Sequence, residues 1–330
     1  MRRFGVTVTG TGSYTPERVL TNHDLEKMVD TSDEWIRART GILERRIAAP
    51  EQTSSDLACR AAEKALTMAE TKADDLDLII VATLSPDRPF PNTACFVQRK
   101  LQADQAACFS LEAACSGFIY AFQVAGGLIR DGVCRKALVV GAEKISMHVD
   151  WTDRNTCVLF GDGAGAVILE ATEPENDIAL AAEMGSDGTL TDLLTVRGGG
   201  SENPPGPEIL KQRSHYLTME GREVFKLAVN AMVNSASSTL NKANISSEQL
   251  KWLVPHQANI RIVQAVGKRL GIANGNVYMN LHKYGNTSAA TIPICLDEMN
   301  RGEQLQSGDY VLMVSFGAGL TWGSVLLQWP

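Results

Sequence analysis

The chain has 330 residues, of which 44% are hydrophobic and 21% charged, and its formal net charge is −7. These values are typical of a soluble globular protein with an ample core and argue against disorder. The negative charge argues against a nucleic-acid partner, which would need a basic face. The seven cysteines are odd in number and lack Cys-x-x-Cys spacing, which predicts reduced thiols rather than disulfides or a zinc site.

The N-terminal segment carries two arginines but no apolar signal core. Its alternating threonines over residues 7–11 predict a strand that turns near Ser13, so we expect no export. No apolar stretch of the sequence reaches the length needed to span a bilayer. We therefore expect a cytoplasmic protein without a membrane partner.

Short apolar runs alternate with helical patterns along the chain. The runs predict strands at 5–9, 78–83, 137–141, 164–170, 252–255, 310–316 and 323–329. Near-continuous apolar strands are typical of sheets covered on both faces, as in layered α/β proteins. Apolar residues at helical spacing predict helices at about 54–66, 115–129, 224–233 and 260–270, and another from about residue 286. The Gly- and Pro-rich segment 198–207 predicts a surface loop.

The order of these elements occurs twice. In each part a strand, a helix and a second strand lead to a glycine turn, at 161–165 and at 317–319, and then to a third strand. The order predicts two equivalent halves, residues 1–172 and 173–330, with a boundary in the acidic stretch 170–177. Cys115 and Asn286 would then lie at equivalent helix starts.

Both glycine turns lead into strands rather than into the helix that a dinucleotide fingerprint requires. Tight turns with exposed amides that could hold an oxyanion are the better interpretation. The sequence contains no Walker motif and no cluster of metal ligands, so we expect no bound metal.

Cys115 lies in the segment 113–118 (Ala-Ala-Cys-Ser-Gly-Phe). At a helix start, the unpaired amides and the helix dipole would favour the thiolate, and small neighbours would let a substrate carbonyl approach. Taken alone, a buried structural cysteine is the commoner alternative. We assign that structural role to the remaining cysteines: Cys59, Cys95, Cys108, Cys134, Cys157 and Cys295.

Two further polar positions suit acyl transfer. His256 follows a predicted strand, and a neutral imidazole can take a proton or donate a hydrogen bond to an oxyanion. Asn286, in a glycine turn, has an amide donor that never titrates and can polarise a carbonyl. Alone, the histidine suits a surface or a satisfied core position, and the asparagine suits a turn or helix cap.

Together these segments resemble the β-ketoacyl-acyl-carrier-protein synthase III family of the thiolase superfamily. The resemblance runs from end to end and rests on the motifs at 30–36, 39–42, 113–118, 160–166, 255–259, 284–288 and 316–323. The combination of cysteine, histidine and asparagine is specific, because elongating ketosynthases have a second histidine and thiolases a second cysteine. The resemblance implies an α/β protein with a duplicated five-layer αβαβα thiolase-like fold.

The resemblance also implies a two-step condensation that starts fatty-acid synthesis. Cys115 would take the acyl group of a short acyl-CoA, most simply acetyl-CoA, while the amides of Cys115 and Ala318 hold the oxyanion. His256 and Asn286 would then stabilise the enolate formed by decarboxylation of malonyl-acyl-carrier protein. CoA is thus part of a substrate, and no cofactor is implied.

The remaining site residues are likewise implied by the resemblance. Those expected to bind CoA are Thr31, Trp35, Arg39, Arg154, Phe160, Met219, Asn259 and Phe316. Acyl-carrier-protein docking would involve Gln257 and Arg261. The family is homodimeric, and Phe90 should enter the acyl pocket of the neighbouring subunit. Ala318, Asn155 and Arg222 depart from residues frequent in the family, which leaves the preferred primer open.

Three alternatives remain at this stage. A synthase of the same architecture could serve a specialised polyketide or quinolone pathway. A thioester hydrolase could also use cysteine, histidine and asparagine, and would release free acid without a carrier protein. A non-catalytic subunit on this fold is disfavoured because all three polar segments are intact.

Overall fold

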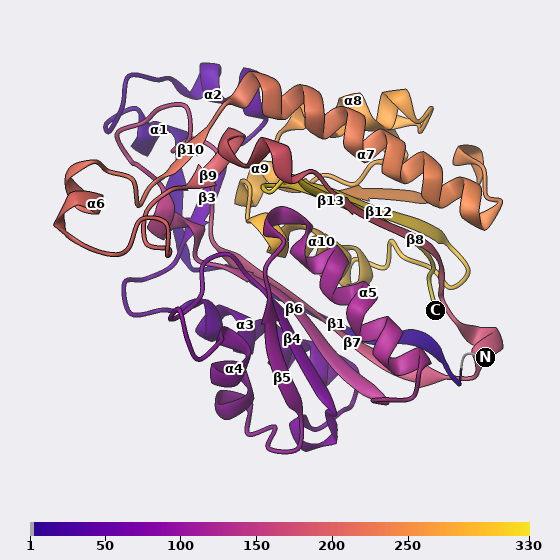
Figure 1. The fold of residues 1–330 in the computed structure, drawn as a ribbon. Coiled ribbons are helices and arrows are strands. Elements are labelled where there is room, and N and C mark those ends of the chain that lie inside the picture. Colours follow the sequence, from indigo (N-terminus) through magenta and orange to yellow (C-terminus); the bar gives the residue numbers. More distant parts are fainter. Residues whose placement is uncertain (1–2) are drawn as a thin grey trace.

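In the computed structural model, which describes residues 3–330, two sheets alternate with three layers of helices (Figure 1). The first sheet comprises β1 (Gly5–Tyr14), β4 (Leu78–Ala82), β5 (Ala107–Leu111), β6 (Lys136–Glu143) and β7 (Gly163–Thr172). The second comprises β8 (Ala179–Ser186), β11 (Trp252–Pro255), β12 (Tyr310–Gly317) and β13 (Thr321–Gln328). Two short pairs lie outside them: β2 (Arg18–Thr21) with β3 (Glu44–Ile47), and β9 (Leu194–Val196) with β10 (Leu217–Met219).

The two sheets have the same internal order. The first runs β1-β7-β6-β4-β5 and the second runs β8-β13-β12-β11. In both, each of the first three strands is antiparallel to its neighbour among them, and the fourth is parallel to the third. A duplicated fold accounts for this match. The exact boundary between 172 and 173 remains a prediction, although it falls between β7 and β8.

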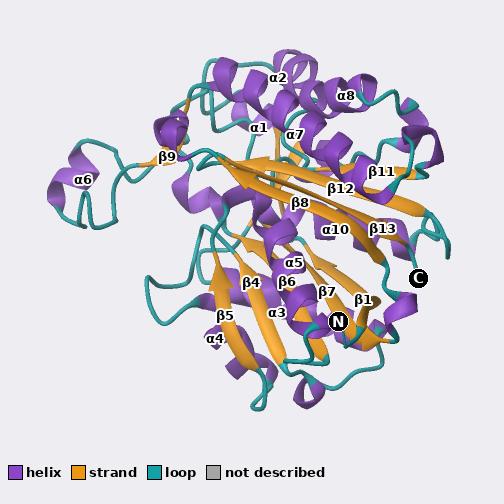
Figure 2. Ribbon diagram, turned by 45° about the vertical axis from the view of Figure 1, so that its right-hand side comes forward, coloured by secondary structure: helices purple, strands orange, loops and turns teal. Residues whose placement is uncertain are grey.

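Helices separate and cover the sheets, giving the five layers (Figure 2). Helices α3 (Ser54–Met68) and α4 (Thr93–Leu101) pack on the outer face of the first sheet, and α7 (Gly221–Ala243) packs on that of the second, beside α8 (Ile260–Arg269). Between the sheets lie α5 (Gly117–Arg130) and α10 (Thr291–Arg301). The shorter helices are α1 (Asn22–Leu25), α2 (Asp33–Thr40), α6 (Pro207–Lys211) and α9 (Leu281–Tyr284).

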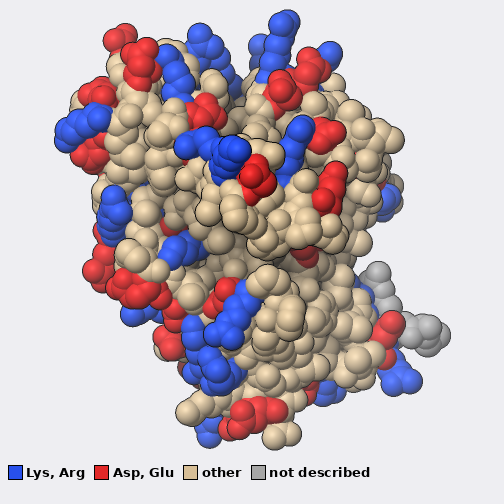
Figure 3. Space-filling view, turned by 60° about the vertical axis from the view of Figure 1, so that its left-hand side comes forward, with Lys and Arg blue, Asp and Glu red and all other residues tan. Residues whose placement is uncertain are grey.

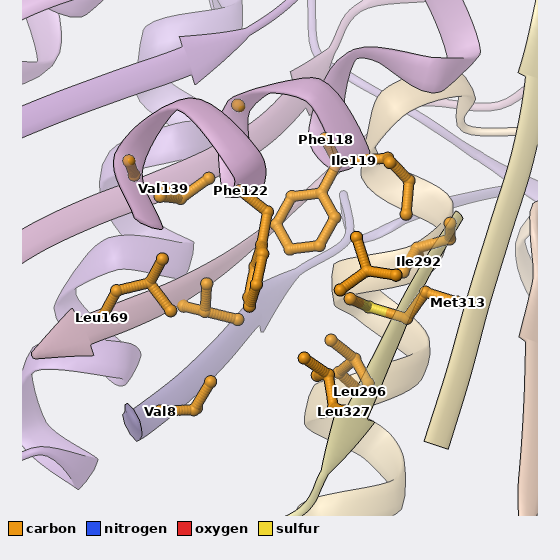
Figure 4. Close-up of a cluster of buried hydrophobic side chains, with 14 of the residues drawn as sticks. Val8, Phe118, Ile119, Phe122, Val139, Leu169, Ile292, Leu296, Met313 and Leu327 are labelled. Carbon is orange, nitrogen blue, oxygen red and sulfur yellow. The ribbon is translucent and has the colours of Figure 1, made fainter. Parts of the chain in front are cut away.

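The central layer forms the main core. Phe118 and Phe122 of α5 face Ile292 and Leu296 of α10, and the side chain of Met313 meets them from β12 (Figure 4). All five side chains are buried. Helices α5 and α10 are apolar toward both sheets, so their burial fixes the position of their ends relative to the strands. The polar segments of the site lie at those ends.

Every strand predicted from an apolar run is present, with bounds shifted by a few residues. The first continues to Tyr14 instead of ending at Thr9, and Gly10 lies within it: a Cβ there would come within 2.3 Å of the Ala65 carbonyl oxygen of α3. The glycine therefore permits close helix packing rather than a turn. Edge strands β5 and β8 were not predicted, since neither is a continuous buried run.

The predicted helices are also present, and helix α7 extends well beyond its predicted bounds. The predicted loop 198–207 precedes the short helix α6, which projects from the layers at the left of Figure 1. In the described part of the chain, no helix has the length and apolar character to cross a membrane.

Candidate active site

One cavity of about 550 Å³ lies between the two halves of the chain. It brings together residues that the sequence places far apart, from the segment between β5 and α5 in one half and from the segments after β11, before α10 and at the end of β12 in the other. The predicted site residues that line it are Cys115, Phe160, Met219, His256, Asn259, Asn286, Phe316 and Ala318.

Cys115 lies in a single 3-10 turn, η2 (Ala114–Ser116), that leads into α5, rather than in the first turn of α5 as predicted. The preceding Ala114 has φ +46°, a left-handed conformation that turns the chain sharply after β5. The Cys115 carbonyl accepts a hydrogen bond from Ser315 Oγ at 2.7 Å. A Cβ at Gly317 would lie 2.7 Å from the Cys115 amide nitrogen, so glycine is needed for this close approach.

The expected preference for the thiolate is wrong for the resting site. Burial raises the pKa of Cys115 to about 12, and the nearby Glu143 carboxylate acts in the same direction. The Ser288 hydroxyl lowers this pKa but does not offset burial. Since desolvation outweighs the favourable turn amides, the resting nucleophile is a neutral thiol that must lose its proton during the reaction.

His256 follows β11 and is 3% exposed. Its backbone amide donates to the Val314 carbonyl of β12 at 2.8 Å, and ring atom Nδ1 lies 2.8 Å from Thr291 Oγ1. Burial lowers the pKa of His256 to about 3, so the imidazole is neutral. Among residues 3–330, no group is hydrogen-bonded to Nε2, and this nitrogen is left for a ligand in the cavity.

Asn286 is held from both sides. Its backbone amide donates to the Leu159 carbonyl at 2.8 Å, and its carbonyl accepts from the Gly161 amide at 3.0 Å. Its side-chain Oδ1 accepts a hydrogen bond from the Ser288 amide at 2.8 Å. Because Oδ1 is occupied in this way, the Nδ2 donor is the part of the amide available to a substrate oxygen.

The two glycine turns differ in their backbone amides. In the turn at 161–165, the Gly161 amide donates to Asn286 and the Asp162 amide donates to Arg46, so an oxyanion site there is excluded. In the turn after β12, Ala318 lines the cavity beside Cys115. Thr321 Oγ1 holds this turn against the residue before η2, since it has a single proton to donate and lies within hydrogen-bond distance of the carbonyls of Ala113 and Ala318, at 2.9 and 3.1 Å.

Sequence reasoning missed a carboxylate beneath the site. Glu143, the last residue of β6, is completely buried and accepts hydrogen bonds from the hydroxyls of Ser85 and Thr83 and from the Leu84 amide. Burial raises its pKa to about 7. The Ser288 hydroxyl lowers the pKa of both Glu143 and Cys115, although among residues 3–330 it makes no hydrogen bond of ordinary geometry. The signal available in the sequence was a charged residue at the end of a largely apolar strand.

Three of the residues predicted to bind CoA form a separate cluster outside the cavity lining. The guanidinium of Arg154 lies 4.7 Å from the centroid of the Trp35 ring, and that of Arg39 lies 5.8 Å from it. Arg154 also pairs with Asp30 at 3.7 Å. Thr31 precedes the same segment and has a buried hydroxyl that finds no hydrogen-bond partner among residues 3–330.

One predicted docking residue is wrong. Gln257 has no exposed surface; its Nε2 donates to the carbonyls of Pro255 and Tyr278, and its Oε1 accepts from the Asn280 amide. Arg261 is exposed at the start of α8 and donates to the Ala38 carbonyl. Asn259 caps the same helix by accepting from the Arg261 amide. Gln257 therefore positions the segment after His256 and cannot meet a partner protein.

The other six cysteines are not among the residues that line the cavity. All seven are free thiols; Cys59, Cys134, Cys157 and Cys295 are buried, but Cys95 and Cys108 are only half-buried and lie 3.7 Å apart at sulfur. The buried structural role predicted for this last pair is therefore only partly correct. Within residues 3–330, no group of three or more His, Cys, Asp or Glu side chains could hold a metal ion.

Comparison with known proteins agrees with this geometry. The family model 3-oxoacyl-[acyl-carrier-protein] synthase III matches residues 109–188, and the model of the C-terminal part of that family matches residues 240–329. The β-ketoacyl-[acyl-carrier-protein] synthase III of Caldanaerobacter subterraneus is 51% identical over 322 residues, which cover 98% of this chain and 97% of that protein. The chain belongs to the 3-oxoacyl-[acyl-carrier-protein] synthase III family.

Solved structures support the same assignment. The 3-oxoacyl-[acyl-carrier-protein] synthase III of Aquifex aeolicus superposes with a TM-score of 0.92 at 48% identity, covering 98% of this chain and 100% of that one. The priming β-ketosynthase of the R1128 polyketide pathway also has a TM-score of 0.92, at 34% identity, covering 100% and 97%. As a member of this family, the chain is an acyltransferase of the ketosynthase type with a thiolase-like fold.

Proposed function

We propose that Cys115, His256 and Asn286 catalyse the condensation of a short acyl-CoA, such as acetyl-CoA, with malonyl-acyl-carrier protein in fatty-acid synthesis. The observation that supports this most directly is their convergence on one cavity. The three residues come from two halves of the chain, and all are buried to within 8% exposure. Each residue taken alone could have a purely structural role, but no structural role explains why all three line the same cavity.

In the first step, Cys115 Sγ bonds to the acyl carbon of the CoA thioester. Its proton passes to Nε2 of His256, and the amides of Cys115 and Ala318 hold the oxyanion. When the intermediate collapses, the bond to the CoA sulfur breaks and the departing thiolate takes the proton from Nε2. The enzyme keeps an acyl-cysteine and a neutral histidine.

In the second step, the malonyl thioester occupies the emptied cavity. The bond to its carboxylate breaks, carbon dioxide leaves, and the electron pair forms an enolate whose oxygen is held by His256 and by Asn286 Nδ2. The enolate carbon then attacks the acyl-cysteine. The bond to Sγ breaks, the Cys115 thiolate takes up a proton from solvent in place of the one that left with CoA, and a 3-ketoacyl-carrier protein departs.

Binding of CoA would use the aromatic and arginine cluster outside the cavity lining. The guanidinium of Arg154 lies 4.7 Å from the centroid of the Trp35 ring, so it would have to swing away from the ring to admit a purine, which would then gain contacts on both faces. The phosphates of CoA would contact Arg39, whose side chain is exposed near Trp35. Phe160, Met219 and Phe316 line the cavity and give it an apolar surface suited to the pantetheine arm.

Docking of the acidic carrier protein would use basic residues on α7 and α8, which pack side by side. Arg261 is the main candidate, and the other exposed basic residues on these helices include Arg222, Lys226, Lys268 and Arg269. Although the net charge is −7, Lys and Arg are interspersed with Asp and Glu over the surface in Figure 3. Because more distant charge is screened beyond about 10 Å, a local basic face is sufficient for an acidic partner.

We also place the enzyme in the cytoplasm as a homodimer. Phe90 is 84% exposed, the most exposed large hydrophobic side chain of the described residues. A second copy of the chain would bury this ring, and Phe90 would close the partner's acyl pocket against long primers. A bare aromatic ring of this size favours an interface over a solvent-exposed position.

One product assay separates condensation from thioester hydrolysis. The protein is incubated with acetyl-CoA, with and without malonyl-carrier protein, and products are identified by mass. Condensation predicts 3-ketobutyryl-carrier protein only when both substrates are present. Steady release of acetate from acetyl-CoA alone, with no carrier-bound product, would establish the hydrolase instead.

A further inference from the structure

Thr291, the first residue of α10, lies directly behind His256. Its Oγ1 is 2.8 Å from His256 Nδ1 and 3.0 Å from the Ser288 carbonyl oxygen. Thr291 and His256 are each 3% exposed. In the described part of the chain, this hydroxyl is the only hydrogen-bond partner of the imidazole ring.

The number of protons in this contact is fixed. A threonine hydroxyl has one proton to donate and lone pairs to accept, whereas the Ser288 carbonyl can only accept. When the hydroxyl donates to Ser288, as helical threonines commonly do to a preceding carbonyl, it presents a lone pair to Nδ1. The ring must then carry its proton on Nδ1 for both hydrogen bonds to exist.

The opposite arrangement forms one hydrogen bond fewer. If Thr291 donated to a bare Nδ1, its bond to Ser288 would be lost, although the Ser288 carbonyl would keep the Thr291 backbone amide as a donor. Since His256 is neutral and has one ring proton, the first arrangement leaves Nε2 bare and turned to the cavity. A bare Nε2 can accept a proton but cannot donate one.

We propose that Thr291 is a positioning residue that sets the tautomer of His256, holding the proton on Nδ1 in the resting enzyme so that Nε2 can accept the Cys115 proton. This inference rests on the proposed function. Enolate stabilisation requires the proton on Nε2 instead: the ring gains it from water in the emptied cavity and gives up its Nδ1 proton to water, and the same hydroxyl then turns to donate to Nδ1. Thr291 is thus able to satisfy Nδ1 in both half-reactions.

Replacement of the hydroxyl should separate the two half-reactions. In Thr291→Val, which keeps the side-chain shape, a proton on Nδ1 would be buried without an acceptor, so the ring shifts to the form protonated at Nε2. That form cannot take the thiol proton, and we expect Cys115 acylation to slow by ~10-fold to ~100-fold, part of the ~10²–10⁴ that a general base supplies. Decarboxylation of malonyl-carrier protein should stay within ~3-fold.

The tautomer itself is measured by ¹⁵N NMR of histidine-labelled protein, with the His256 signals assigned by their absence in His256→Asn. We expect a protonated Nδ1 in the wild type, a protonated Nε2 in Thr291→Val, and recovery of both tautomer and acylation in Thr291→Ser. A protonated Nε2 in the wild type overturns the inference without any activity measurement. The inference is also overturned if Thr291→Val slows both half-reactions equally and Thr291→Ser recovers neither of them.

These outcomes differ from failure of the proposed function. If Cys115 is not acylated in the wild type, the proposed function fails whatever the tautomer. If Cys115 is acylated and the tautomer does not depend on Thr291, the proposed function stands and only the role of Thr291 is lost.

Discussion

The two junctions that meet at the cavity use one backbone design for different chemistry. In the first half, Ala114 has φ +46° and a 3-10 turn carries Cys115 into α5; in the second half, Ser288 has φ +51° and begins the 3-10 turn η8 (Ser288–Ala290), which leads into α10. Both junctions pack against each other between the sheets. Duplication has thus placed two equivalent turns face to face.

The difference between the junctions lies in their side chains. The first presents a neutral thiol among alanine and glycine, with few groups that would stabilise a thiolate. The second is polar and internally hydrogen-bonded: Asn286 accepts from the Ser288 amide, and Thr291 bridges Ser288 and His256. The first junction therefore supplies the nucleophile and the second orients donors and acceptors, which suits a reaction in two different steps.

The largest effect should follow from removing the nucleophile of the first junction. Cys115→Ser keeps the side-chain size, but a serine hydroxyl is a far weaker nucleophile, and we expect condensation and self-acylation to fall by ~10³-fold or more. The matched control is Cys295→Ser, which alters the buried cysteine of α10. That variant should retain activity within ~3-fold, and comparable loss in both would remove the distinction between the two cysteines.

The second junction is tested by Asn286→Asp. Aspartate keeps the oxygen that accepts from the Ser288 amide but replaces the Nδ2 donor with a negative charge. We expect malonyl decarboxylation to fall by ~10²–10³-fold, the usual loss for one oxyanion donor, while Cys115 is still acylated by acetyl-CoA. Single-turnover assays of each half-reaction measure this separation. Undiminished decarboxylation would show that Asn286 only holds the turn.

Glu143 lies beneath both junctions and should govern a pH dependence of stability. Its pKa rises from 4.5 in the unfolded chain to about 7 in the folded protein, so between these values the folded state holds a proton that the unfolded state has lost. The free energy of unfolding then falls as pH rises through that window, by ~3 kcal/mol in total at ~1.4 kcal/mol per pH unit.

Glu143→Gln should remove this fall, because an amide does not titrate. Denaturant unfolding at pH 4.5 and pH 8 should therefore show a smaller loss of stability in Glu143→Gln than in the wild type. Burial also raises the pKa of Asp162 and lowers that of His256, but both residues are common to the two proteins, and the difference isolates Glu143. Glu202→Gln, at an exposed carboxylate, should behave as wild type. Equal slopes in all three proteins would contradict the assignment.

The smallest effect lies outside both junctions. Arg261→Glu reverses an exposed charge on α8, and we expect KM for malonyl-carrier protein to rise by ~10-fold at low salt with acylation from acetyl-CoA unchanged. The control Lys72→Glu makes the same charge change after α3, in the opposite outer layer. If both variants weaken carrier binding equally, overall charge rather than a docking site on α8 is responsible.

The sequence predicted the layered fold and eight of the residues that line the cavity, because buried strands and polar motifs are local signals. It held only one signal for Glu143, a charge at the end of a largely apolar strand, and none for Thr291, since the roles of both depend on contacts between distant segments: Thr291 lies 35 residues from His256. The error at Gln257 has the same origin, because the side of the chain that faces inward after β11 is decided by packing. For Cys115, a helix start was predicted where a 3-10 turn leads into α5, and burial rather than the turn amides dominates its pKa.

The most direct test of the account is the mass of the Cys115 peptide after exposure to acetyl-CoA, followed by a chase with malonyl-carrier protein. The account predicts one acetyl group on Cys115 that disappears during the chase as 3-ketobutyryl-carrier protein appears. An acetyl group on another cysteine, or an acetyl-Cys115 that the malonyl-carrier protein leaves unchanged, would contradict it.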